Sequence, residues 1–108
     1  MISAELVNHT RSIVKKDFYF ESIEELLPEN EMETMNELRK VLTARIAHML
    51  DHDFELLMQI FYRIDLNENK VKEAIALADE PSEKLAELVL EREMQKAKTR
   101  MAYKNRLH

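Results

Sequence analysis

The chain contains no glycine, no cysteine and no tryptophan, and only two prolines among its 108 residues. The absence of glycine excludes the glycine-rich phosphate loops of nucleotide-binding folds and the glycine turns on which most β-hairpins depend. The absence of cysteine excludes disulfide bonds, cysteine-ligated zinc, iron–sulfur clusters and thiol nucleophiles. From these exclusions we expect a protein without a cofactor.

The composition is that of a small folded chain with an excess of acid. Apolar residues make up 45%, too many for a disordered chain, and the formal net charge is −5. The length predicts one domain over residues 1–108. The sequence has no apolar run of the length that spans a bilayer, and its start lacks the pattern of a secretory signal. We therefore expect a cytoplasmic protein that does not associate with membranes.

The hydrophobic periodicity predicts an all-α bundle of about five helices with a long C-terminal helix. Ser3 is the expected N-cap of the first helix, and Asp65 that of the fourth, because short polar side chains accept hydrogen bonds from free helical N–H groups. A capping box is expected at residues 22–25. The predicted helices cover residues 3–16, 28–50, 54–64, 66–79 and 81–106. One continuous helix over 28–64 is the alternative to a break at residues 51–53.

Residues 54–64 form the most apolar segment, with eight apolar residues among eleven. A helix that is apolar on nearly all sides is typical of the centre of a bundle, so this segment is the predicted core helix. Its three polar residues, Glu55, Gln59 and Arg63, follow one another at intervals of four. We interpret them as one exposed edge of the helix, with buried partners from neighbouring helices as the alternative.

The predicted last helix is long for a domain of this size. Its 26 residues extend roughly 40 Å at ~1.5 Å per residue, whereas a compact domain of this length has a radius of gyration of about 13 Å. Residues 96–108 are therefore expected to protrude or to lie at an interface. The apolar residues of this part favour a homodimer interface, with a frayed end as the alternative; they are Ala97, Met101, Tyr103 and Leu107.

The charges are unevenly distributed along the chain. Residues 17–37 contain eight acids and no base, and residues 92–108 contain six bases and one acid. The basic end, with Tyr103 among the cations, offers an alternative function in nucleic-acid or ribonucleoprotein association. Its expected phosphate contacts are Lys96, Lys98, Arg100, Lys104 and Arg106. The acidic net charge opposes this reading, and basic residues near a helix C-terminus already complement the helix dipole.

His48 and His52 have the only spacing that suggests a metal site, because two histidines four residues apart share one helix face. The pattern is weak, since Met49 stands where zinc proteases of this type need a glutamate. We therefore predict no metal site. The serines have no base at a recognisable spacing, and the paired acids have no reason for a shifted pKa. The chain is thus not expected to be an enzyme.

Residues 54–100 resemble short all-helical bacterial proteins of uncharacterised function. Tyr62-Arg63-Ile64-Asp65, Glu68 and the last helix carry the resemblance. It implies a small cytoplasmic helical protein and implies no activity, cofactor or site residue. The sequence thus favours a protein-interaction or structural protein that acts as a homodimer, with room for a further protein partner.

Overall fold

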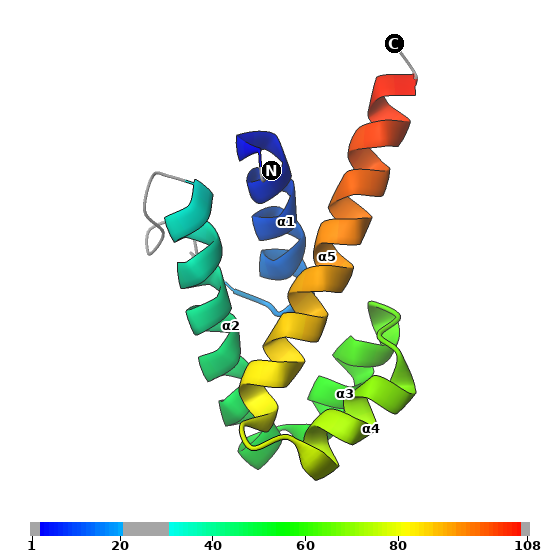
Figure 1. The fold of residues 1–108 in the computed structure, drawn as a ribbon. Helices are drawn as coiled ribbons and strands as arrows, with labels where there is room; N and C mark the ends of the chain where they lie inside the picture. Colours follow the sequence, from blue (N-terminus) through cyan, green and yellow to red (C-terminus); the bar gives the residue numbers. More distant parts are fainter. Residues whose placement is uncertain (1–2, 21–30, 107–108) are drawn as a thin grey trace.

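The computed structural model describes residues 3–20 and 31–106, and it contains five helices and no strand in that part of the chain (Figure 1). The expected all-α fold with a long last helix is confirmed. The helices are α1 (Ala4–Asp17), α2 (Glu31–His52), α3 (Phe54–Arg63), α4 (Glu68–Leu77) and α5 (Pro81–Arg106). The capping box predicted at residues 22–25 lies outside the described residues.

Helix α5 is the central element of the molecule. It runs the length of the fold, with α1 and α2 antiparallel to it on one side and α3 and α4 beside its first half (Figure 1). Three helices, α1, α2 and α4, pack directly against it. The four α5 residues that are nearly or fully inaccessible in the main core are Leu85, Ala86, Val89 and Leu90.

The prediction that residues 54–64 form the central helix is wrong. Only Leu57, Ile60 and Phe61 of α3 are buried, whereas Phe54 is 47% exposed and Tyr62 is 89% exposed. The segment is rich in apolar residues, but part of them face solvent because α3 lies at the outside of the bundle. Its three polar residues are exposed, as the preferred interpretation of the stripe predicted.

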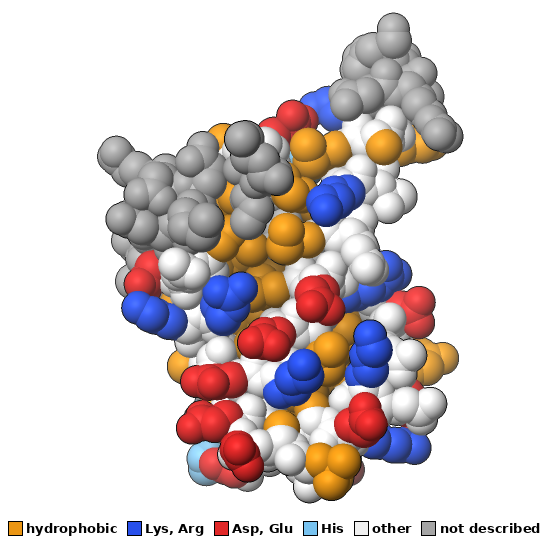
Figure 2. Space-filling model, viewed as in Figure 1, with side chains coloured by type: hydrophobic (Ala, Val, Ile, Leu, Met, Phe, Trp, Pro, Cys, Tyr) orange, Lys and Arg blue, Asp and Glu red, His pale blue; other side chains and the backbone are white. Residues whose placement is uncertain are grey.

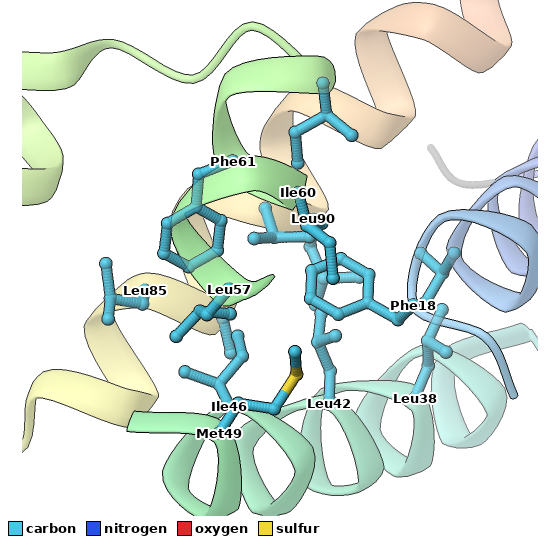
Figure 3. Packing of buried hydrophobic residues seen from close by; sticks show 14 of the residues in the cluster. Phe18, Leu38, Leu42, Ile46, Met49, Leu57, Ile60, Phe61, Leu85 and Leu90 are labelled. Carbon is cyan, nitrogen blue, oxygen red and sulfur yellow. The ribbon is translucent and has the colours of Figure 1, made fainter. Parts of the chain in front are cut away.

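The main core contains side chains from all five helices, and those of α2, α3 and α5 interdigitate with Phe18 (Figure 3). Helix α2 contributes a row of side chains at helical spacing, Met35, Leu38, Leu42, Ile46 and Met49. Phe18, which follows α1, lies across Leu38 and Leu42 in the view of Figure 3 and is 1% exposed. Helix α2 ends at His52, so the described part of the predicted segment 28–64, residues 31–64, forms two helices rather than one.

Helices α1 and α3 end in the same type of turn. Since the chain has no glycine, another residue takes the left-handed conformation in each turn. After α1, Tyr19 has φ 59°, and after α3, Asp65 has φ 62°. The N–H of Phe20 donates to the carbonyl of Lys15, and the N–H of Leu66 donates to that of Phe61, each at 3.0 Å. This is the Schellman arrangement, in which the left-handed residue is usually glycine.

The helix ends correct one predicted cap and confirm another. Asp65 terminates α3 instead of capping α4, and Asn67 is the N-cap of α4, where its side chain accepts from the N–H of Lys70 at 3.1 Å. Both Asp65 and Asn67 are cap-forming residue types, and their places in the four-residue connection between α3 and α4 decide their roles. Ser3 caps α1 as predicted and accepts from the N–H of Leu6 at 3.1 Å.

Two leucines test where the stability of the fold resides. Leu57 is 0% exposed and Leu77 is 77% exposed. Leu57→Ala is expected to lower the free energy of unfolding by about 2–5 kcal/mol, because it removes buried methyl groups and leaves a cavity. Leu77→Ala, the matched control, is expected to change it by about 0.5 kcal/mol or less. Urea denaturation measures both, and equal losses would contradict the described core.

Candidate functional site: a buried carboxyl pair and the projecting end of α5

Glu93 lies in the apolar face of α5 and is completely buried. The side chain is 0% exposed, on a helix face that continues from Leu90 to Ala97. Neither carboxyl oxygen accepts a hydrogen bond from a described residue, although Lys96 Nζ lies 3.2 Å from Oε2 as an ion pair. A buried carboxylate that accepts no hydrogen bond is costly, so this position is the most unusual chemical feature of the described fold.

Asp17 brings a second carboxyl group from α1 to the same place. It is the last residue of α1, and its Oδ2 accepts a hydrogen bond from Lys96 Nζ at 3.0 Å. Its side chain is only 14% exposed. An acid at a helix C-terminus also faces the negative end of the helix dipole, which increases its need for a cation. Lys96 therefore forms ion pairs with two carboxyl groups that come from different helices.

The two carboxyl groups have opposite pKa shifts. Burial, together with the hydrogen bond and charge of Asp17, raises the pKa of Glu93 to about 8, and Lys96 opposes this only in part. Burial also acts to raise the pKa of Asp17, but hydrogen bonds from Glu93 and Lys96 and the charges of Lys96 and Arg63 outweigh it and lower that pKa. Near neutral pH, Glu93 thus keeps its proton while Asp17 is ionised.

The second feature is the part of α5 that extends beyond its packing with α1. We call residues 98–104 the projecting end. All of its side chains are exposed apart from Met101, which is partly buried, and Tyr103 is 64% exposed. The molecule measures 44 × 28 × 25 Å, so a 26-residue helix of about 39 Å accounts for nearly its whole length. The end rises clear of the other helices in Figure 1.

The structure revises two residues of the predicted interfaces. Ala97 is 0% exposed, because Leu6 and Ile13 of α1 cover it within the same chain, so it offers no surface to a second copy. Lys96 is directed inward to Asp17 and Glu93 and is not available for a phosphate. Both positions lie on the α5 face that α1 covers, which the sequence pattern of α5 alone does not reveal.

The remaining predicted site residues lie in three settings. Lys98, Arg100, Tyr103 and Lys104 are exposed on the projecting end, with Met101 partly buried at its base. The side chain of Arg106 and all of Leu107 lie outside the described residues. His48 and His52 are exposed near the end of α2, with ring centroids 4.5 Å apart. Among the described residues, no third histidine or acidic side chain completes a metal-ligating group there.

Glu93 and Asp17 were not singled out from the sequence, where Glu93 counted only as the one acid of a basic segment. A pattern that identifies Glu93 is nevertheless present. The buried positions Ala86, Leu90, Glu93 and Ala97 follow one another at intervals of four, three and four, so the glutamate interrupts an apolar row. The pairing with Asp17, 76 positions earlier in the sequence, depends on the antiparallel packing of α1 on α5.

Comparisons with known proteins identify no relative for this chain, since no family model, no curated protein and no solved structure matches it. Among the described residues, no helix has both the length and the apolar character needed to cross a membrane.

Lys96→Met tests whether this lysine compensates the buried carboxyl groups. The substitution keeps most of the aliphatic stem and leaves Asp17 and Glu93 without their shared cation. We expect the free energy of unfolding at neutral pH to fall by about 3 kcal/mol, the lower part of the range for breaking a buried ion pair. The matched control is Lys98→Met, at an exposed position two residues further along α5. It is expected to change the free energy of unfolding by about 0.5 kcal/mol or less. Similar losses in urea denaturation would show that Lys96 has no special role.

Proposed function

We propose that this protein is a helical protein-interaction protein that acts as a homodimer through the projecting end of α5. The observation that carries the proposal is the exposed helix beyond the last residue that α1 covers, Ala97, with Tyr103 64% exposed on it. A short helical segment without tertiary contacts is marginally stable in water. Packing against a partner supplies the contacts that this segment lacks within one chain.

The charges of α5 favour a second copy as the partner. The first half of the helix exposes Glu83, Glu87 and Glu91, and the second half exposes Lys98, Arg100 and Lys104. Two copies of such a helix complement each other when they pair antiparallel, because each acidic half then faces a basic half. A two-fold dimer requires this kind of self-complementary surface, in which each contact occurs twice. The charges fix the orientation of the pair, and the apolar contacts supply most of its free energy.

The surface of the main body supports a partner of mixed charge. Acidic and basic side chains lie among one another over the lower part of the face in Figure 2, where α4 and the first half of α5 meet. A shallow groove between these helices has Leu77 and Leu88 among its lining residues. Its charged lining residues are three acids, Glu73, Glu87 and Glu91, and two bases, Lys70 and Lys84. Leu77 is 77% exposed, so an apolar contact is available beside the acids. The basic, tyrosine-containing end of a second α5 matches that chemistry.

Charge reversal tests the proposed dimer. We expect the unmodified chain to have the mass of a dimer, and we expect the double variant Lys98→Glu/Lys104→Glu to weaken dimerisation by at least about tenfold, since like charges then face each other. Light scattering across micromolar concentrations measures the mass. Lys40→Glu, a reversal of an exposed lysine on α2, is the matched control and is expected to leave the mass unchanged.

A compensating exchange separates charge pairing from general damage. Adding Glu87→Lys/Glu91→Lys to the double variant restores opposite charges across the antiparallel pair, and the dimer mass is expected to return. A monomeric unmodified chain, or a dimer that the reversal leaves intact, would refute the proposal.

The projecting end also supports a second candidate function, nucleic-acid association. Lys98, Arg100 and Lys104 are exposed around Tyr103, a set that suits phosphate contacts and base stacking. The net charge of −5 makes this the weaker candidate. For three phosphate contacts, the affinity for a labelled single-stranded RNA is expected to fall with a log–log salt slope of about −2. The absence of a mobility shift at low salt would remove this candidate.

A further inference from the structure

The packing of α1 on α5 contains an internal charge imbalance. Two carboxyl groups, Asp17 from α1 and Glu93 from α5, share the ammonium group of Lys96. Glu93 is 0% exposed, and neither of its oxygens accepts a hydrogen bond from a described residue. With both carboxyl groups ionised, this interface holds one uncompensated negative charge, and one proton removes it.

The other charges near the pair do not correct the imbalance. From α3, Arg63 acts on Asp17, but its guanidinium is exposed and donates a hydrogen bond to the hydroxyl of Tyr19 at 2.9 Å. Arg92, next to Glu93 on α5, donates to the carbonyl of Ile64 at 2.9 Å and lies 3.8 Å from Asp65. Helix α2 presents mainly apolar side chains to α5, and the residues that α4 buries are Val71 and Ala74. Lys96 is thus the cation in contact with both carboxyl groups.

The repulsion acts across one particular interface. Because Asp17 and Glu93 belong to different helices, loss of the proton opposes the contact between α1 and α5 and no other helix pair. Beside the carboxyl pair this contact has a small apolar cluster of its own, Leu6, Ile13 and Ala97, in addition to Val7 and Val14, which α1 buries in the main core.

We propose that one proton shared by Asp17 and Glu93 holds α1 against α5, so that the packing of α1 weakens as the solution goes from mildly acidic through neutral pH. Opening of α1 uncovers Ala97 and its neighbour Met94, on the same helix as the projecting end. The proposal concerns a helix contact within one chain and does not depend on dimerisation.

The direction of the pH dependence follows from proton linkage. The pKa of Glu93 is raised from 4.5 to about 8 in the packed state, so the packed state binds more protons than an open state in which Glu93 is solvated. Between pH 4.5 and about 8, the packing of α1 on α5 is therefore strongest at the low end and weakens as the pH rises. Asp17 has a lowered pKa, so its contribution is lost only on the acid side, as pH falls below 3.8.

Amide hydrogen exchange of the full chain tests this proposal. After correction for the intrinsic exchange rate, the opening equilibrium of α1 is expected to increase by at least about tenfold between about pH 6 and about pH 8. Amides of α2 near Leu42 are expected to change less. In Glu93→Gln, which cannot ionise, α1 is expected to show no such increase. Glu55→Gln, at an exposed position on α3, is the matched control and should behave like the unmodified chain.

A pH-independent opening of α1 in the unmodified chain would overturn the proposal, and so would an equally steep pH dependence in Glu93→Gln. A measurement on the unmodified chain keeps the test valid if that variant fails to fold. The side-chain carboxyl resonance of Glu93, followed by carbon NMR, is expected to titrate with a midpoint near 8. A midpoint near the ordinary value of 4.5 would equally overturn it.

Discussion

The packing of α1, α2 and α4 around α5 is the constraint on which the rest of the structure depends. Each of these helices buries one face, and those faces meet on the apolar side of α5 between Leu85 and Ala97. Helix α5 is also longer than the helices that cover it. This arrangement has two consequences for α5. Its middle carries a fully buried acid between α1 and the core, and its last turns extend beyond the body.

The lack of glycine shapes the junctions between helices. Tyr19 and Asp65 adopt the left-handed conformation that glycine usually supplies, at a cost of about 1 kcal/mol or more each. Both residues also make cross-helix contacts. The hydroxyl of Tyr19 accepts from Arg63, and Asp65 lies 3.8 Å from Arg92. The turns therefore bring the ends of α1 and α3 toward α5, in the region where Asp17 and Glu93 meet.

Much of the fold was predictable because helix formation here is decided locally. The period of the apolar residues, the N-cap Ser3 and the proline at position 81 define helices whose ends the structure reproduces closely. The order of the helices in space was less predictable. Apolar content pointed to α3 as the central helix, but Tyr62 and Phe54 face solvent, and α5 occupies the centre despite its many charged residues. Burial depends on which face meets a neighbour, and composition does not contain that information.

The sequence by itself determined the helical class, the positions of the helices and the opposite charges of the two halves of α5, since these depend on residues close together in the chain. Only the tertiary structure decided that Ala97 and Lys96 belong to the interior. It also brought Asp17 to Glu93 and gave that glutamate a pKa far from its ordinary value. The physical reason is that desolvation and ion pairing depend on groups distant in sequence, which the antiparallel packing of α1 and α5 brings together.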